Sequence, residues 1–241
     1  MFCRAPSANP LSPCRAPIDP VHLLCTNTRT PALARRTKEE ALATREHLLD
    51  TAETMFLQRG VARTSLHDIA SAAGLTRGAV YWHFEDKAAL YNALMDRFSA
   101  PCQQAVSGLD TTLYPDAMAA LRALAWTPIE LVLNDERARR LFTIAMHRVE
   151  FNEDLGAIWE RHMSKGSEFI AMLERGLQAA QAQGLCAPEL PLRPVALGLF
   201  ALIDGLLTYA TLDPSRVAEL RTAGVALDAY LAGLRTPKPS R

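Results

Sequence analysis

The sequence has little of several features that mark other classes of protein. Its five cysteines are odd in number, widely scattered and never spaced as C-x-x-C, so neither a disulfide framework nor a zinc knuckle is predicted. Free thiols of this kind are typical of a reducing cytoplasm. The formal net charge is zero, so the overall charge does not favour nucleic acid as a partner. Any argument for DNA must come from the local placement of basic residues.

Long uncharged apolar runs are also lacking, although a membrane-spanning helix needs roughly 18 such residues or more. The richest apolar run, 192–211, is interrupted by Arg193, Pro194 and Asp204. With 49% hydrophobic residues in a chain of 241, the sequence can still bury a sizeable core. We therefore expect a cytoplasmic protein that has no membrane partner.

The motifs of common enzymes are missing too. The sequence contains no HExxH motif, no glycine-rich phosphate loop and no recognisable Ser/His/Asp set. His147 and Glu150 are three residues apart, but their order is the reverse of the E-x-x-H of di-metal carboxylate sites, and no second copy follows. We expect no enzymatic activity, no metal and no cofactor. A helical-bundle metalloenzyme is the remote alternative.

Residues 1–33 differ in composition from the rest of the chain. They hold six of the fifteen prolines and show no periodic apolar face, so we expect a disordered extension. The arginines Arg4, Arg15 and Arg29 would suit an organellar transit peptide, but the prolines would break the amphipathic helix that such a peptide needs.

From Thr37 onward the sequence becomes helical, and Gly60 is expected to end this first helix. Its apolar residues recur at helical spacing and define a buried face. That face comprises Leu48, Leu49, Ala52 and Phe56. The residues expected to face solvent are Arg45, Glu46, Glu53 and Arg59.

Two short helices joined by a glycine turn are predicted next. Ser65 with Asp68 resembles a capping box that starts the first of them. The turn is Ala73-Gly74-Leu75, and Thr76 is expected to cap a helix over 77–84. The residues expected to hold this helix-turn-helix together are Leu66, Ile69, Leu75, Val80 and Phe84.

The surface of the second short helix favours DNA as the partner. Tyr81, Trp82 and His83 are consecutive, and one buried face cannot hide all three. Arg77 in the first turn suits bidentate contact with guanine, and Lys87 suits a phosphate. For Trp82 alone, packing against the first helix is an open alternative. Residues 57–84 are locally basic, with three arginines against the single acid Asp68.

The remainder of the chain reads as successive amphipathic helices, so the predicted fold class is all-α. The expected helices cover 87–109, 116–133, 136–149, 155–183, 192–211 and 214–233. Pro101 should kink the helix over 87–109 near the junction with the DNA-reading part.

The last two predicted helices carry apolar surface that could pack inside one subunit or between two, and the sequence leaves both open. The last helix has an apolar seam at steps of three and four, and its neighbour has small residues that permit close approach. The seam is Leu220, Ala223, Leu227, Tyr230 and Leu234, and the small residues are Gly198, Ala201 and Gly205.

Bulky and adaptable apolar side chains are available for a pocket, although core packing is the better interpretation for each alone. They are Trp126, Phe142, Met146, Trp159, Phe169, Met172, Phe200, Ile203 and Leu207. Asp204 places a carboxylate inside an apolar helix, which is costly unless the group is paired or functional. We therefore predict a functional role for Asp204.

Several motifs together resemble the TetR family, and more narrowly the AcrR-type repressors of multidrug efflux operons. The resemblance is dense over 34–98 and looser afterwards. Its motifs are Arg35-Arg36-Thr37-Lys38-Glu39-Glu40, Arg63-Thr64-Ser65-Leu66, Asp68-Ile69-Ala70, the run 73–84 (AGLTRGAVYWHF), Lys87, and Ile203-Asp204-Gly205. Since relatives often begin just before the first of these motifs, a second hypothesis places the true start at Leu33.

The resemblance implies a helix-turn-helix DNA-binding domain over 34–86, a helical-bundle ligand-binding and dimerisation domain over 87–235, and a disordered tail over 236–241. The implied DNA-binding residues are Ser65, Thr76, Arg77, Gly78, Ala79, Tyr81, Trp82, His83 and Lys87. The implied ligand-binding residues are Trp126, Phe142, Met146, Phe169, Phe200, Ile203, Asp204 and Leu207.

The implied function is that of a ligand-responsive repressor. A homodimer formed through the last two helices would bind a palindromic operator in double-stranded DNA. A small hydrophobic or amphipathic drug-like effector would release it, and the controlled genes would be a multidrug efflux operon. The alternatives are a regulator of catabolic, envelope or quorum genes, or an activator.

Overall fold

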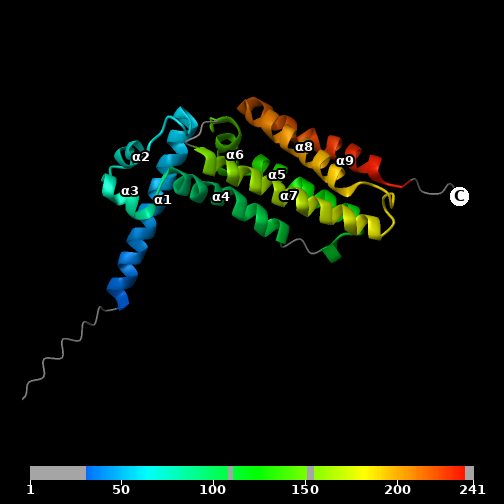
Figure 1. Cartoon of the computed structure of the whole chain (residues 1–241), viewed down its shortest axis with the longest axis horizontal. Coiled ribbons are helices and arrows are strands. Elements are labelled where there is room, and N and C mark those ends of the chain that lie inside the picture. Colours follow the sequence, from blue (N-terminus) through cyan, green and yellow to red (C-terminus); the bar gives the residue numbers. More distant parts are fainter. Residues whose placement is uncertain (1–30, 108–110, 151–154, 237–241) are drawn as a thin grey trace, which may run out of the picture. The chain divides into compact units, whose positions relative to one another are not determined.

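The computed structural model describes residues 31–107, 111–150 and 155–236 (Figure 1). The chain divides into two compact units, Met1–Glu40 and Ala41–Arg241, and all contacts discussed below lie within the second. The α-helices are α1 (Pro31–Arg59), α2 (Leu66–Ala72), α3 (Arg77–His83), α4 (Lys87–Ser107), α5 (Ala117–Asn134), α6 (Glu136–His147), α7 (Gly156–Ala182), α8 (Leu192–Thr211) and α9 (Ala223–Leu234), with 3-10 helices η1 (Thr111–Leu113) and η3 (Pro214–Thr222).

The predicted all-α fold class is confirmed. Over the described residues the only extended pairing is an isolated bridge between Cys186 and Arg235. The predicted disorder of 1–33 concerns mostly residues outside the described range, although helix α1 already begins at Pro31. The domain boundaries at 34, 87 and 236 stay predictions.

Local signals in the sequence set the boundaries of the first three helices. Gly60 follows the end of α1 with a φ of 85°, a conformation that residues with a Cβ rarely adopt. Gly74 takes a φ of 68° in the turn between α2 and α3. Ser65 and Thr76 are the N-caps of α2 and α3, as expected.

Two expectations about α1 and α3 need correction. Helix α3 ends at His83, with Phe84 as its C-cap. Glu53 was expected to face solvent, but it is 5% exposed, because arginines of α6 cover its carboxylate. Periodicity within α1 could not show this, since the covering residues are more than eighty positions away.

The distal helices lie close to their predicted bounds, with one exception. Helix α4 continues through Pro101, and α5 contains a second internal proline, Pro128. The segment 214–233, expected to be one helix, is a 3-10 helix up to Thr222 and an α-helix only from Ala223. Asp213 caps the 3-10 helix and Pro214 is its first residue.

Two hydrophobic cores hold the second unit together. One joins the buried faces of α1, α2, α3 and the first half of α4 with residues of α6 and α7, among them Leu141 and Ile158. The other lies among α5, α7, α8, η3 and α9 and includes Phe142. Adjacent residues of α6, Leu141 and Phe142, therefore belong to different cores, and α6 lies between them.

The apolar seam of the last helix packs inside its own subunit. Leu220, Leu227 and Ala223 are buried in the second core, the one that includes Phe142, and Tyr230 and Leu234 pack against it. The intramolecular alternative therefore accounts for this seam. Helices α8 and α9 run beside each other along this body (Figure 1).

Candidate DNA-reading helix and effector cavity

The start of α2 is fixed by a reciprocal capping box. The Ser65 hydroxyl accepts from the Asp68 amide at 3.1 Å, and the Ser65 amide donates to Asp68 Oδ2 at 2.9 Å. The Ser65 hydroxyl also donates to Asp68 Oδ2 at 2.6 Å, and this bond, followed by the one from the Ser65 amide, lowers the pKa of the Asp68 carboxyl. Ser65 thus stands at the N-terminus of α2, where its hydroxyl is engaged in the cap.

Helix α3 presents an open face with two large aromatic rings. Trp82 is 72% exposed and Tyr81 is 46% exposed, and Arg77 and Gly78 are exposed beside them. The Arg77 guanidinium lies over the Tyr81 ring, 5.5 Å from its centroid. At this exposure Trp82 is not buried against the first helix. Exposed aromatics on a short helix of this kind are suited to a partner surface.

Two other residues predicted to contact DNA, Ala79 and His83, are less open. His83 is half-buried, with its ring edge-on to Trp82 at 4.5 Å. Burial, and secondarily the charge of Arg45, lowers the His83 pKa, so the ring is mostly neutral at neutral pH. Ala79 is half-buried, and its amide donates to the hydroxyl of Thr76 at 3.2 Å, while Thr76 itself is exposed.

Lys87 has a structural role that the sequence did not reveal. Its ammonium donates to the carbonyl oxygens of Val61 and Ala62, at 3.0 and 3.2 Å. Asp86 Oδ1 accepts from the Ala89 amide at 2.6 Å, in the first turn of α4. Lys87 therefore connects the start of α4 to the turn after α1, in addition to the predicted contact with phosphate.

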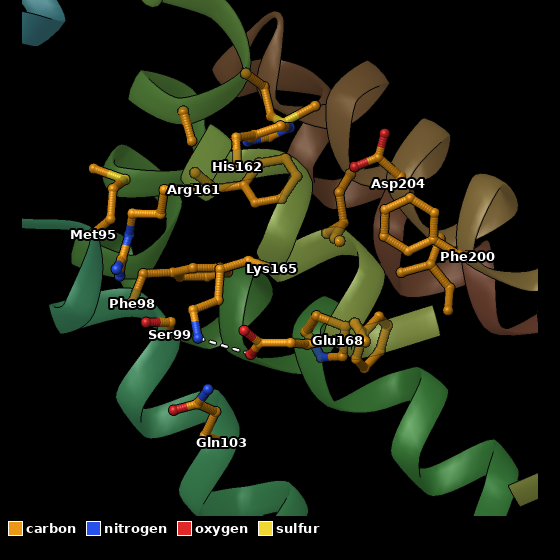
Figure 2. A pocket seen from close by; sticks show the side chains of 18 of the residues that line it. Met95, Phe98, Ser99, Gln103, Arg161, His162, Lys165, Glu168, Phe200 and Asp204 are labelled. Carbon is orange, nitrogen blue, oxygen red and sulfur yellow. Dashed lines mark hydrogen bonds and ion pairs between the residues drawn. The ribbon is translucent and has the colours of Figure 1, made fainter. Parts of the chain in front are cut away.

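A cavity of about 200 Å³ lies among α4, α5, α6, α7 and α8 (Figure 2). It is lined by seven of the eight residues that the resemblance assigned to a ligand. These are Phe142, Met146, Phe169, Phe200, Ile203, Asp204 and Leu207. The lining also includes Met172 of the wider apolar set.

Two aromatic residues of the predicted pocket lie elsewhere. Trp126 packs against α9, where its ring lies under the Arg122 guanidinium at 5.9 Å and beside Gly224. Trp159 is 40% exposed and stacks on His162 at 5.5 Å, outside the cavity lining. For Trp126 the ordinary interpretation as a packing residue describes its position.

The sequence did not reveal the contribution of α4 to this cavity, nor the residues of α7 before Phe169. Helix α4 supplies Tyr91, Met95, Phe98, Ser99 and Gln103, and α7 supplies Arg161, His162, Lys165, Gly166 and Glu168. The spacing of the α4 residues by three and four positions was the signal that could have shown a lining face. In Figure 2 the Lys165 to Glu168 ion pair, 2.8 Å long, lies near Ser99.

Asp204 is the polar group in this lining that most needs a partner. It has no hydrogen bond or ion pair with any other described residue, and it is only partly exposed. Burial raises the pKa of its carboxyl, and the charge of His162 opposes that effect in part. An under-solvated carboxylate in an apolar cavity favours a ligand that donates a hydrogen bond or carries positive charge.

Helix α8 has a buried side and an outer side. By length and composition alone it could cross a membrane, with a mean hydropathy of 1.5, so Arg193, Pro194 and Asp204 do not exclude that on their own. A third of its apolar window is buried. The outer side of α8 and α9, together with the C-cap of α8, shows exposed apolar residues, namely Leu197, Tyr209, Leu212 and Val225.

Comparison with known proteins agrees with this geometry. Residues 48–94 match the bacterial regulatory proteins of the tetR family, and residues 116–235 match the C-terminal region of MAATS-type transcriptional repressors. The HTH-type transcriptional regulator TtgR of Pseudomonas putida is 35% identical over 203 residues, which cover 84% of this chain and 97% of TtgR. The chain belongs to the TetR family.

Other TetR-family relatives are similar in sequence and in structure. AcrR of Shigella flexneri is 32% identical over 175 residues, covering 73% of this chain and 81% of AcrR. The crystal structure of NalD, the secondary repressor of the MexAB-OprM multidrug efflux pump in Pseudomonas aeruginosa, superposes with a TM-score of 0.72 at 33% identity, covering 83% of this chain and all of NalD.

A complex of SmeT with triclosan gives a TM-score of 0.67 at 30% identity, covering 83% of this chain and 99% of that one. SmeT is the repressor of the Stenotrophomonas maltophilia efflux pump SmeDEF. Members of the TetR family are transcriptional regulators, so this chain is a regulator and not an enzyme, and the metalloenzyme alternative is removed.

Proposed function

We propose that this TetR-family regulator represses a multidrug efflux operon and is released from DNA by a small hydrophobic or amphipathic effector. The relatives that support this proposal include NalD and SmeT, whose descriptions name efflux pumps. One observation carries the proposal. Helix α4 lines the cavity with Met95 and Phe98, and its first residue, Lys87, is bonded to the turn that precedes the DNA-reading helices.

The DNA-binding surface in this proposal is the open face of α3. Thr76, Arg77, Gly78, Tyr81 and Trp82 are the exposed part of the predicted set. Arg77 is suited to read a guanine in the major groove, while the hydroxyl and indole hydrogens of Tyr81 and Trp82 suit phosphates. This face is bordered and supported by Ser65, Ala79, His83 and Lys87. Lys87 is the first residue of α4, where it could also contact a phosphate.

The regulator acts as a homodimer in this proposal, because a palindrome is read by two recognition helices about one turn of DNA apart. The outer side of α8 and α9 supports this. It combines exposed apolar residues such as Leu197 and Val225 with Gly205, beside which a Cβ would meet no atom within 4 Å. A second copy would cover this apolar surface. In a cytoplasmic protein no membrane is there to cover it instead.

The effector binds the α4–α8 cavity in this proposal. Apolar rings such as Phe142, Phe169 and Phe200 would contact its body, and Asp204 would accept a hydrogen bond or pair with a cationic nitrogen. Effector binding biases the dimer between a form that fits the operator and a form that does not.

The test is DNase footprinting of the full-length protein on the DNA upstream of its own gene, with and without triclosan. A protected palindrome that is lost on adding triclosan is the expected result. Protection that responds only to a cellular metabolite would support the second candidate, a regulator of catabolic, envelope or quorum genes. If no site is protected, the proposal that the protein binds an operator upstream of its own gene is contradicted.

A further inference from the structure

The acidic face of α1 meets three arginines from two helices that line the cavity. Glu46, Asp50 and Glu53 follow one another at steps of four and three, and therefore lie on one face of α1. Arg97 of α4 pairs with Glu46 and with Asp50, the latter at 2.8 Å. The other two arginines, Arg137 and Arg140, come from the first turns of α6 and pair with Asp50 and Glu53.

Glu53 is the member of this group that is buried. Its side chain is 7% exposed, and its two carboxylate oxygens are held by different arginines. Arg140 Nε lies 2.6 Å from Oε1, and Arg137 Nε lies 3.2 Å from Oε2. A buried carboxylate is tolerated only when its charge is compensated, so the position of α1 depends on these two residues of α6.

The same helix carries three cavity-lining residues directly after the two arginines. Phe142, Ala145 and Met146 line the cavity, and Phe142 is two positions beyond Arg140. At the far end of α6, the His147 ring lies 3.0 Å from the Thr211 hydroxyl of α8. Helix α6 therefore contacts α1 through its beginning, the cavity through its middle and α8 through its end.

We propose that Glu53 is the positioning residue through which α6 reports the state of the cavity to the DNA-reading unit. This inference rests on the proposed function, since it assumes that operator and effector binding are linked. Displacement of Phe142 by a ligand moves the start of α6, and Arg137 and Arg140 move with it. Because the buried Glu53 carboxylate cannot remain without these counter-charges, Glu53 follows and α1 moves too. Neutralising Glu53 therefore weakens the linkage without removing either binding site.

A second contact joins the α1 region to the other end of α6, so the proposed role of Glu53 concerns only the first turns of α6. The Val61 amide, in the turn after α1, donates to the Arg148 carbonyl at the end of α6 at 2.8 Å. This backbone bond does not depend on Glu53. Loss of the Glu53 charge should therefore affect the first turns of α6 and leave the region around Arg148 as it is.

Linkage between sites is reciprocal, so the inference can be tested with DNA alone. Hydrogen–deuterium exchange is measured on the full-length protein, with and without a duplex that carries the footprinted operator. The variants are Glu53→Gln and Arg140→Gln, which cut the contact from its two sides. The matched control is Glu136→Gln, because Glu136 pairs with Arg140 at 2.9 Å within α6 and does not touch α1.

In the wild type and in Glu136→Gln, operator binding is expected to slow exchange of amides 140–144 by about fivefold or more, the lower end of usual coupling factors. In Glu53→Gln and Arg140→Gln this slowing should be lost, while amides 77–83 remain protected by DNA in every protein. Unchanged slowing at 140–144 in both variants, or none in the wild type, would overturn the inference. No DNA protection of 77–83 in any protein would instead contradict operator binding.

Discussion

The hydroxyl of Tyr230 occupies the place that a side chain at Gly198 would need. A Cβ built on Gly198 would lie 2.6 Å from Tyr230 Oη, closer than two such atoms can approach. The hydroxyl is fixed there because it donates to the Val195 carbonyl at 2.9 Å. Gly198 and Gly205 lie on the same helix, but only the first is required by the packing of its own subunit.

Gly198→Ala should destabilise the protein. The added methyl group forces either Tyr230 or α9 to move, and overpacking of this kind costs about 1–3 kcal/mol. Urea denaturation followed by circular dichroism measures the loss. Gly205→Ala is the matched control on the same helix, because it meets no atom within 4 Å in the subunit. Since alanine is the better helix former, Gly205→Ala should keep or gain stability, and an equal loss in both variants would show that something other than Tyr230, such as the dimer, sets the requirement.

Leu197→Asp should separate the proposed homodimer while each subunit stays folded. Leu197 is 53% exposed in the subunit, so a charge there costs little until a second apolar surface covers it. Sedimentation velocity should show a shift from dimer to monomer. Leu113→Asp is the control, since Leu113 is 79% exposed on η1 and far in sequence from α8. A dimer that survives Leu197→Asp would place the interface elsewhere.

Arg77→Ala should weaken operator binding by about 1–3 kcal/mol and relax the preference for one base pair, as expected when a bidentate guanine contact is lost. Fluorescence anisotropy with the operator and with each single-base variant of it measures both effects. If affinity falls by the same factor for every sequence, Arg77 contacts a phosphate and not a base.

Asp204→Asn should make the protein no less stable at neutral pH. The difference in unfolding free energy between this variant and the wild type should depend on pH. Burial raises the folded-state pKa of Asp204 above its ordinary value of 3.8, so the folded form binds the proton more tightly than the unfolded one. The contribution of Asp204 to stability is therefore lost as pH rises from 3.8 through the raised pKa.

Urea denaturation of both proteins at pH 4 and pH 7 tests this prediction. The stability of Asp204→Asn relative to the wild type should increase with pH. A relative stability that decreases with pH would mean that the ionised carboxylate has a stabilising partner. The same variant should keep its operator affinity and bind cationic effectors more weakly.

The sequence allowed the local parts of the fold to be predicted. Ser65 and Thr76 cap their helices, and Gly60 and Gly74 take positive φ values, because each of these roles depends on residues within a few positions. The exposed ring of Trp82 was harder, since the sequence left burial against α1 as an equal alternative.

Features that depend on distant residues were not predictable in this way. The burial of Glu53 requires arginines of α6, and the engagement of Lys87 requires two carbonyls of the turn after α1. The cavity residues of α8 were expected, because the resemblance named them and the apolar setting of Asp204 pointed to a functional role, whereas neither signal was available for α4.

The outer side of α8 has a consequence for the abundance of the regulator if a second copy covers it. Apolar residues on this side, among them Leu197 and Tyr209, are about half exposed in the single subunit, and such a surface invites aggregation or proteolysis when a subunit is alone. If a second copy covers it, the melting temperature rises with protein concentration, since association stabilises only the folded form. Newly made subunits at low abundance would then be the most short-lived, and the cellular level of the regulator would have a threshold set by its own assembly.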